Sequence, residues 1–320
     1  MLIACAALAP RPAVAQQGGV QTAAVPDADR FPARPLTMVI GYAAGGSTDI
    51  QGRVLAEVLG EQLGQKVEVV NLTGSGGAVA AAMLASSREQ GHVFMFGLSS
   101  VYSISPLLAP ASYDLASFRY VAGVSLDQSA YVTSGNSPFR DWHSLMDFLR
   151  ANPGQAYVTQ TGEDRLLMKA IAQKEGLDLR FVPSSGGAGM APLVISGDVF
   201  FAYSGGTHTG YTDSGEMRLL ATPARDRLLG YPDVPTLKEL GHDLALHALR
   251  IVVVPADTPD AQVKVLRDAL ERASADPRFV EVTEKRIRQP IGFTEGADVE
   301  AMLQAQVEDY RRLIAEVGLQ

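Results

Sequence analysis

The residues best suited to chemistry in this sequence are glycines and hydroxyl side chains that follow short apolar runs. The first such turn contains Ala44, Gly45, Gly46, Ser47 and Thr48. Glycine lets a ligand approach the backbone closely, and free N–H groups at the start of a helix attract carboxylate or phosphate. Hydroxyl groups add further donors. This turn is therefore a candidate anion site that needs no Lys or Arg.

A simpler interpretation stays open for the same turn. Its glycines would only make a tight turn, and Ser47 or Thr48 would cap the following helix. Asp49 would then stabilise the positive end of the helix, although it could also hold the loop or accept a hydrogen bond from a ligand amine. Three such loops, each at the end of a successive strand, favour a binding site over this alternative.

Further candidates follow later strands. They are Ser99 after the third strand, then Thr161, Ser184, Ser185, Gly186, Ala188 and Ser204. Two basic side chains lie near these loops, and we interpret Arg165 as an exposed helix charge. Arg250 lies inside an apolar run, where a charge needs a partner, either an internal carboxylate or the ligand.

The sequence has few motifs that are typical of enzymes or of metal sites. The sequence has no GxSxG, no GxxxxGK and no GxGxxG after a strand, and its five His include no HExxH. His208 beside Ser204 is a weak pairing, and we expect this histidine to be a solvated loop residue. We therefore expect no catalysis, no metal and no cofactor, and the competing hypothesis is a hydrolase or transferase that uses a loop serine.

Composition excludes several classes of protein. Of the 320 residues, 47% are hydrophobic and 19% charged, so the chain can bury a sizeable core. The net charge of −8, without a basic patch, disfavours a nucleic-acid partner. Cys5 is the only cysteine, so no disulfide framework is possible.

The candidate loops need strands and helices to position them. The sequence predicts a strand over residues 36–40, a helix that continues to Leu63 and stops at Gly64, and a second strand over 66–70. The alternation continues with a helix over 78–87 and a strand over 93–96. Alternating strands and helices predict an α/β protein with mostly parallel sheets.

A change of pattern over residues 120–133 indicates a strand that crosses into a second α/β lobe. The run 244–254 indicates the return crossing, and two helices follow, after an N-cap at Thr258 and from Thr294 onward. We therefore assign residues 34–130 with 246–320 to lobe 1 and 131–245 to lobe 2.

The first residues are typical of an export signal. An apolar run leads to Ala13, Val14 and Ala15, an A-x-A cleavage site, although no Lys or Arg precedes the run. We expect a signal peptide over residues 1–15, a flexible lead-in over 16–33 and a periplasmic mature protein. Acylation at Cys5 is the alternative.

Six stretches of the sequence carry a family resemblance, at residues 31–37, 43–49, 59–70, 71–78, 231–241 and 254–259. On these stretches the chain resembles the Bug or TctC-like extracytoplasmic solute receptors of tripartite tricarboxylate transporters. The resemblance implies a type II periplasmic binding protein fold with two lobes and a hinged cleft. It also implies a small carboxylate ligand, held by residues 44–49 and by Ser184, Ser185, Gly186 and Ala188, and delivery to a membrane permease.

Residues 159–165, 182–186, 203–204 and 248–251 depart from the family pattern, and an aromatic ring and a basic side chain are lost. The distal half of the pocket is therefore expected to be rebuilt, with Arg250 as a replacement charge. We expect a monomer that binds a di- or tricarboxylate or an aromatic acid. A receptor that feeds a sensor kinase is a further alternative.

Overall fold

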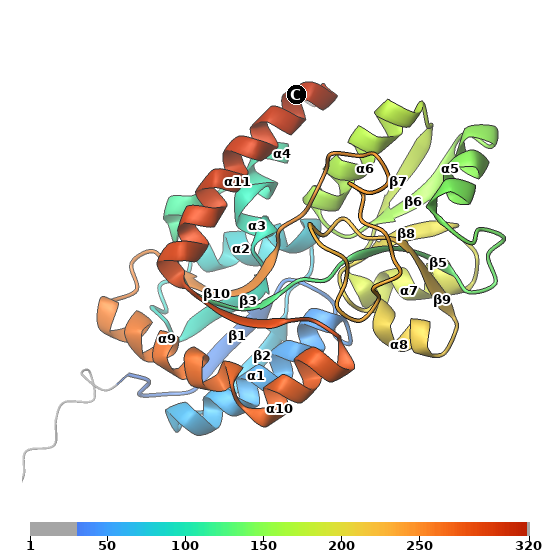
Figure 1. The fold of residues 1–320 in the computed structure, drawn as a ribbon. Helices are drawn as coiled ribbons and strands as arrows, with labels where there is room; N and C mark the ends of the chain where they lie inside the picture. Colours follow the sequence, from blue (N-terminus) through green and yellow to red (C-terminus); the bar gives the residue numbers. More distant parts are fainter. Residues whose placement is uncertain (1–30, 319–320) are drawn as a thin grey trace, which may run out of the picture. The chain divides into compact units, whose positions relative to one another are not determined.

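The computed structural model describes residues 31–318, and two β-sheets organise this part of the chain (Figure 1). The predicted signal peptide and residues 16–30 of the predicted lead-in lie outside the described residues. The first sheet consists, in spatial order, of β11 (Ile291–Glu295), β4 (Phe118–Leu126), β10 (Leu249–Pro255), β3 (Val93–Leu98), β1 (Leu36–Ile40) and β2 (Val67–Asn71).

Helices cover both faces of the first sheet. Figure 1 shows α2, α3 and α11 on one side and α1, α9 and α10 on the other. The helices of this first lobe are α1 (Ser47–Leu63), α2 (Ala78–Ala85), α3 (Ser100–Ser103), α4 (Ser105–Leu108), α9 (Asp260–Ser274), α10 (Pro277–Val280) and α11 (Gly296–Val317). Short helical turns η2 (Ser75–Gly77), η3 (Leu115–Ser117) and η4 (Glu281–Arg286, a π-helix) complete it.

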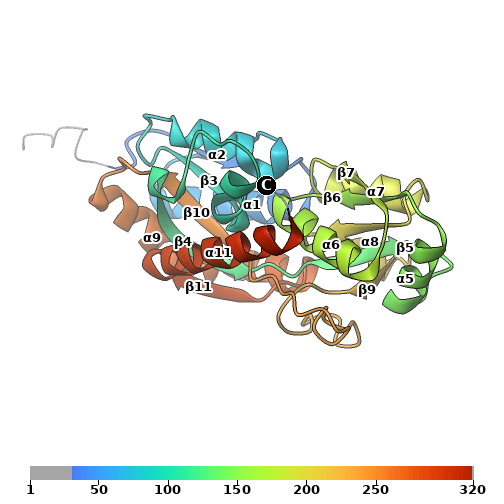
Figure 2. The same cartoon turned by 90° about the horizontal axis from the view of Figure 1, so that it is seen from above.

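The second sheet has five strands and its own hydrophobic core. Its strands, in spatial order, are β7 (Leu179–Pro183), β6 (Gln155–Thr159), β8 (Phe201–Ser204), β5 (Ala130–Ser134) and β9 (Met217–Ala221). The helices of this second lobe are α5 (Trp142–Ala151), α6 (Gly162–Glu175), α7 (Gly187–Ile195) and α8 (His208–Asp213). Figures 1 and 2 show this sheet beside the first, with α5 and α6 on one of its faces.

The predicted α/β fold class is confirmed, and the strand directions show how the lobes are joined. Strands β2, β1 and β3 are parallel, whereas β10 runs antiparallel to both of its neighbours, β3 and β4. In the second sheet β5 runs antiparallel between β8 and β9. Both sheets are therefore mixed, because strands that cross between the lobes enter from the opposite direction.

Helix α1 shows how the sequence fixes the first candidate loop. Leu55, Val58 and Leu59 recur at helical spacing and are fully buried against the sheet. Gly64 ends the helix in the left-handed region, at φ 66°, and its N–H donates to the carbonyl of Gly60, as predicted. At the other end Gly46 occupies the N-cap position without a side-chain bond, so the prediction that Ser47 or Thr48 caps the helix is wrong.

Two predictions near the C-terminal end were wrong, and one strand was not predicted. Pro259, not Thr258, is the N-cap of α9. Thr294 lies in strand β11, and α11 begins only at Gly296. Strand β11 was missed because five residues with one apolar face give a weak period. None of the helices within the described residues is long and apolar enough to span a membrane.

Helix α11 links the two lobes. It packs along the first lobe against β4 and α3, and its last turns reach α6 of the second lobe. There Tyr310 forms a small buried cluster with Ile104 and Leu166. The lobes are thus joined by crossing strands and also by side chains of the last helix.

Candidate ligand-binding site

The turn before α1 has an exposed tip and a buried base. Ala44 and Gly45 are exposed, whereas Gly46, Ser47 and Thr48 are buried. The amide of Gly45 donates to Asp49 Oδ2 at 2.9 Å. Asp49 therefore holds the loop, which was one of the three roles open for it.

Hydrogen bonds stabilise the ionised form of Asp49. Burial alone would raise its pKa, but hydrogen bonds from Arg53, the Gly45 amide and Asn71 outweigh that effect and lower the pKa below its usual range. An ionised carboxylate thus lies on the amide of this turn. The Gly45 N–H group points in a direction that suits an anion, and the anion that occupies it is the Asp49 carboxylate of the protein itself.

Ser47 connects this turn to the second lobe. Its hydroxyl donates to the carbonyl of Gly205 at 2.6 Å, and its amide donates to Thr207 Oγ1 at 3.2 Å. One turn earlier, the Ala43 amide donates to the carbonyl of Ser185 at 3.0 Å. The candidate loops of the two lobes therefore meet, although they are more than 130 residues apart in the sequence.

The loop before α7 lies against the first lobe. Gly186, at φ 116°, is its N-cap, and a Cβ there would lie 3.4 Å from Tyr42. The positive φ therefore favours glycine at this position, whereas Tyr42 lies at ordinary contact distance. A Cβ on Gly46 would lie 4.0 Å from the Ala188 amide, so these two helix starts face each other across the lobes.

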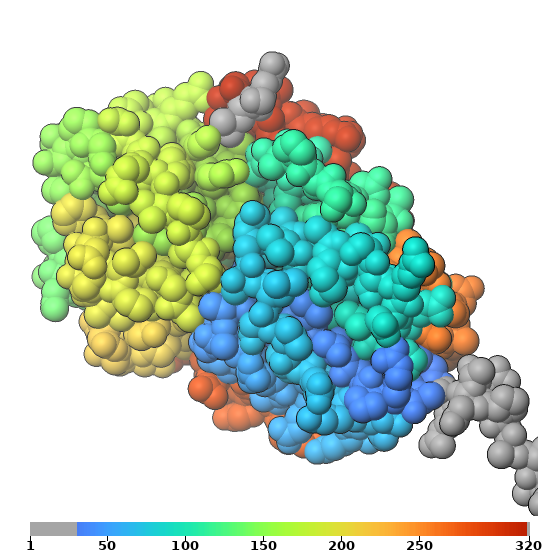
Figure 3. Space-filling model, turned by 180° about the vertical axis from the view of Figure 1, so that it is seen from behind, coloured from blue at the N-terminus to red at the C-terminus, as the bar shows by residue number. Residues whose placement is uncertain are grey.

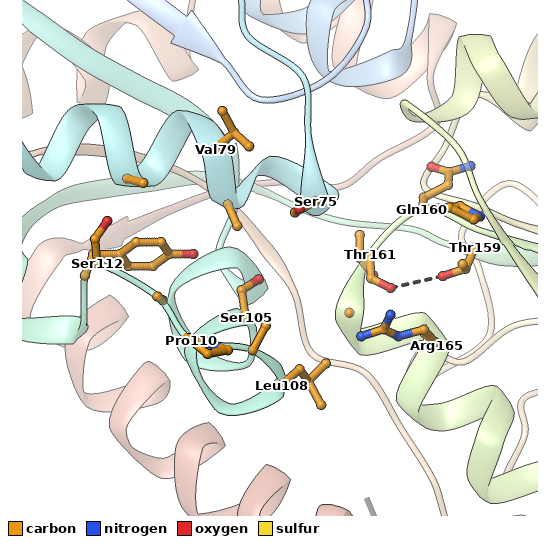
Figure 4. A pocket seen from close by; sticks show the side chains of 18 of the residues that line it. Ser75, Val79, Ser105, Leu108, Pro110, Ser112, Thr159, Gln160, Thr161 and Arg165 are labelled. Carbon is orange, nitrogen blue, oxygen red and sulfur yellow. Dashed lines mark hydrogen bonds between the residues drawn. The ribbon is translucent and has the colours of Figure 1, made fainter. Parts of the chain in front are cut away.

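A cavity of about 610 Å³ opens between the lobes, and only part of the predicted site lines it (Figure 4). Thr161, the N-cap of α6, and Ser184, whose hydroxyl donates to the Thr159 carbonyl, belong to its wall. The remaining predicted residues lie elsewhere. The sequence missed the first-lobe wall, which includes Ser75, Val79, Ser105, Leu108 and Tyr113.

The first-lobe wall comes from η2, α2, α4 and the loop after α4, and the second-lobe wall comes from the start of α6 and the end of β7. Figure 3 shows the seam where blue and cyan residues of the first lobe meet yellow-green residues of the second. The only signal for α4 was a short run around Pro106, too short to be distinguished from a loop.

Arg250 is fully buried and has an internal partner. Its Nη2 donates to Ser47 Oγ at 2.7 Å, to the Gly205 carbonyl at 3.0 Å and to Asp127 Oδ1 at 3.2 Å. Of the two partners left open for this charge, the structure has the internal carboxylate. Arg250 thereby supports Ser47 instead of lining the cavity.

The Arg250–Asp127 pair lies where the chain crosses between the lobes. Burial raises the pKa of Asp127, although Arg250 and Gln289 act against it, and burial lowers the pKa of Arg250. Gln289 Nε2 donates to Asp127 Oδ1 at 3.0 Å. Asp127 was missed because it lies in the break between two strands, where an exposed turn residue is the usual interpretation.

Two predicted serines have buried structural positions. The Ser99 hydroxyl accepts a hydrogen bond from the Leu249 amide at 3.1 Å, inside the first lobe. Ser204 Oγ lies 3.2 Å from His208 Nδ1. His208 is 2% exposed and belongs to α8, so the prediction of a solvated loop histidine is wrong.

The Ser204–His208 pair is the nearest approach to an enzyme-like arrangement. Burial, and secondarily the charge of Arg288, lowers the pKa of His208 to about 4, so its ring is neutral near pH 7. Both side chains are buried and neither lines the cavity. Within residues 31–318 no three His, Cys, Asp or Glu side chains gather closely enough to hold a metal ion.

Two α/β lobes, joined by crossing strands and facing each other across a cavity, are an architecture found in solute-binding receptors. The sequence profile of the "Tripartite tricarboxylate transporter family receptor", TctC, matches residues 52–319. The chain belongs to this family.

Relatives and solved structures agree with this assignment. A protein of Cupriavidus necator, "UPF0065 protein in gbd 5'region", is 32% identical over 267 residues, covering 82% of this chain and 81% of the relative. The periplasmic binding protein BugD superposes with a TM-score of 0.84 at 24% identity, covering 91% of this chain and 99% of BugD.

Two further structures hold ligands. MatC of Rhodopseudomonas palustris, with bound malate, has a TM-score of 0.82 at 21% identity, covering 89% of this chain and 100% of MatC. A protein of R. palustris with adipate has a TM-score of 0.81 at 22% identity, covering 90% of this chain and 98% of that protein. At sequence identities this low, the two structures are evidence for the fold of this chain only.

Proposed function

We propose that this receptor captures a small carboxylate between its lobes in the periplasm and delivers it to the membrane permease of a tripartite tricarboxylate transporter. The ligand is a di- or tricarboxylate or an aromatic acid, bound without chemical change. Two proteins of the same fold hold malate and adipate, which supports a carboxylate.

The observation that carries this proposal is the meeting of two helix starts across the lobes. A Cβ added to Gly46, in the turn before α1, would lie 4.0 Å from the amide of Ala188 at the start of α7. A glycine directly precedes each helix, and both turns carry hydroxyl side chains, so N–H and O–H donors converge there. The cationic side chain of Arg250 contacts Ser47, but Asp127 balances its charge. Such a region favours a carboxylate over a neutral sugar or a cation.

The contacts within the turn divide the proposed residues by role. Ala44, Gly46 and Thr48, with Ser185, Gly186 and Ala188, are proposed to contact the carboxylate. Gly45, Ser47 and Asp49 shape the turn, because hydrogen bonds inside the protein occupy their polar groups. Arg250 positions Ser47, because Asp127 balances its charge.

The proposal extends to the whole chain. Residues 1–15 direct export, 34–130 with 246–320 form the first lobe and 131–245 form the second. The mature protein acts as a monomer. Burial of the Ser204–His208 pair away from the cavity argues against the loop-serine hydrolase or transferase.

A thermal-shift screen of the mature protein tests the ligand class. Mono-, di- and tricarboxylates are compared with neutral sugars and with divalent cations. A ligand at 100 times its dissociation constant should stabilise the protein by about 2.7 kcal/mol. Stabilisation by sugars or cations, with no response to any carboxylate, would show that the proposed class is wrong.

The variant Gly46→Val tests the position of the site. Gly46 has φ −74° and ψ 165°, which valine tolerates, so the fold should survive. A Cβ at this position lies 3.3 Å from the Ala43 carbonyl and points toward Ala188, so the larger side chain should abolish carboxylate binding.

Gly210→Val is the matched control, because a Cβ there meets nothing within 4 Å. Thermal unfolding of both variants verifies the fold, and titration calorimetry measures binding. Unchanged affinity in Gly46→Val would remove this turn from the site.

A further inference from the structure

Among the residues that the structure describes, Arg165 is the one charged side chain in the wall of the 610 Å³ cavity. It is exposed, and no carboxylate among residues 31–318 lies within ion-pair distance of it. Its acidic neighbours are otherwise engaged: Glu163 accepts from Tyr310, and Asp164 accepts from the Gln160 amide at 2.8 Å. Arg165 therefore has a full positive charge available to a ligand in the cavity.

The opposite wall carries apolar side chains among the hydroxyl groups of Ser75, Ser105 and Ser112. Val79 and Leu108 project from the first lobe, and Figure 4 shows them across the opening from Arg165 and Thr161. Val79 is 44% exposed, unusually high for a large apolar residue in this protein. Covering it with an apolar group would stabilise the complex by the hydrophobic effect.

The cavity adjoins the proposed carboxylate grip. Ser184 lies in the cavity wall and directly precedes Ser185, whose carbonyl accepts from the Ala43 amide. A volume of about 610 Å³ lies in the middle of the roughly 300–1,000 Å³ range of ligand pockets, so it offers more room than a four-carbon acid fills.

We propose that the cavity holds the distal half of the ligand and that Arg165 pairs with a second carboxylate. The ligand is then a dicarboxylate whose two ends are separated by an apolar spacer that covers Val79 and Leu108. This inference rests on the proposed function, since the first carboxylate lies at the loops. Short hydroxylated acids leave the apolar wall uncovered and bind more weakly.

Titration calorimetry with adipate, hexanoate and malate tests this inference. Adipate and hexanoate share a six-carbon backbone, but in hexanoate a methyl group replaces the second carboxylate. Arg165→Gln should weaken adipate binding at least fivefold and change hexanoate binding less than twofold. Lys169→Gln is the matched control, because it removes the same charge one turn further along α6 outside the cavity.

A second variant examines the apolar wall. Val79→Ser should weaken adipate binding and leave malate binding unchanged, so the preference for adipate over malate should fall.

The outcomes separate this inference from the proposed function. Suppose that adipate binds the unsubstituted protein. If Arg165→Gln then weakens the binding of adipate and hexanoate by the same factor, or weakens the binding of neither acid, the role of Arg165 is wrong while the receptor function stands. If malate binds the unsubstituted protein as well as adipate does, the apolar spacer is wrong. If the protein binds none of the three acids, this inference is wrong, and the thermal-shift screen against the other carboxylates decides whether the receptor function stands.

Discussion

At the scale of single residues, Arg250 shows how a buried charge is tolerated. Its guanidinium is fully buried but has Asp127, Ser47, Gln51 and a backbone carbonyl as partners. Burying a charge is costly unless it is paired and hydrogen-bonded. Arg250 and Asp127 can therefore each stay buried in the charged form only because the other is present.

Removing one member of this pair should be strongly destabilising. Arg250→Met leaves the Asp127 carboxylate buried without its cation, and we expect a loss of about 3–5 kcal/mol in the free energy of unfolding. Urea denaturation at pH 7 measures it. The double variant Arg250→Met/Asp127→Asn, which removes both charges, should recover much of the loss, and a single-variant loss below about 1 kcal/mol would contradict the pairing.

The sequence predicted part of this arrangement. An arginine between Leu249 and Ile251 must have a partner, and that requirement is local. The choice of Asp127 is not local, because 123 residues separate the two side chains. His208 was mispredicted for the same reason: its four-residue spacing from Ser204 was visible, but its burial depends on Tyr231 and on distant segments.

At the scale of elements, the start of α6 gathers the buried acids of the second lobe. Thr161 caps the helix in a capping box with Asp164. Asp164 has three hydrogen-bond donors, yet burial raises its pKa to about 7. Burial also raises the pKa of Glu163 to about 7, against the bond from Tyr310 of α11.

This environment predicts a pH dependence of stability. Because the folded pKa of Glu163 lies above its ordinary value of 4.5, the folded state binds more protons between these two values. The stabilising contribution of Glu163 to the free energy of unfolding is therefore fully present below pH 4.5 and is lost as the pH rises through 7. Glu163→Gln should lose this dependence and gain roughly 2–3 kcal/mol relative to the unsubstituted protein at pH 8.

Urea denaturation at pH 5 and pH 8 checks this prediction. Glu300→Gln, on the exposed face of α11, is the control and should follow the unsubstituted protein. Asp164 titrates in the same range, so some slope should persist in Glu163→Gln. An identical pH profile in Glu163→Gln and the unsubstituted protein would show that Glu163 is ionised in the fold.

Regular elements were the part of the fold that the sequence predicted best. The spacing of Leu55, Val58 and Leu59 specified α1, and Gly64 specified its end. The π-helix η4 and strand β11 were not predicted, because neither has an apolar period long enough to detect. The cavity was not predicted either, since its walls come from elements far apart in the chain.

At the scale of the whole molecule, the lobes touch at several points. Besides the contacts of Ser47 and Ala43, Leu108 of α4 packs against Gly162 of α6, where a Cβ would lie 2.7 Å from its side chain. Glycine at this position lets the lobes approach at the edge of the cavity. Closure of the lobes around a ligand would need the same approach.

A larger residue at this contact should hold the lobes apart. With Gly162→Leu we expect at least a tenfold loss of adipate affinity, because closure would be hindered. Small-angle X-ray scattering should show a decrease in radius of gyration on adding adipate to the unsubstituted protein and none for Gly162→Leu. The control variant Gly210→Leu, on α8, should behave as the unsubstituted protein. A decrease in the radius of gyration of Gly162→Leu on adding adipate would refute the role of Gly162 in lobe closure.

The central position of β10 has a consequence for how the molecule is made. This strand lies between β3 and β4, yet residues 249–255 follow β4 by more than 120 positions. Until they emerge from the ribosome, the inner edges of β3 and β4 have no partner, and the first lobe cannot finish folding. Its assembly is therefore delayed until most of the polypeptide has been synthesised.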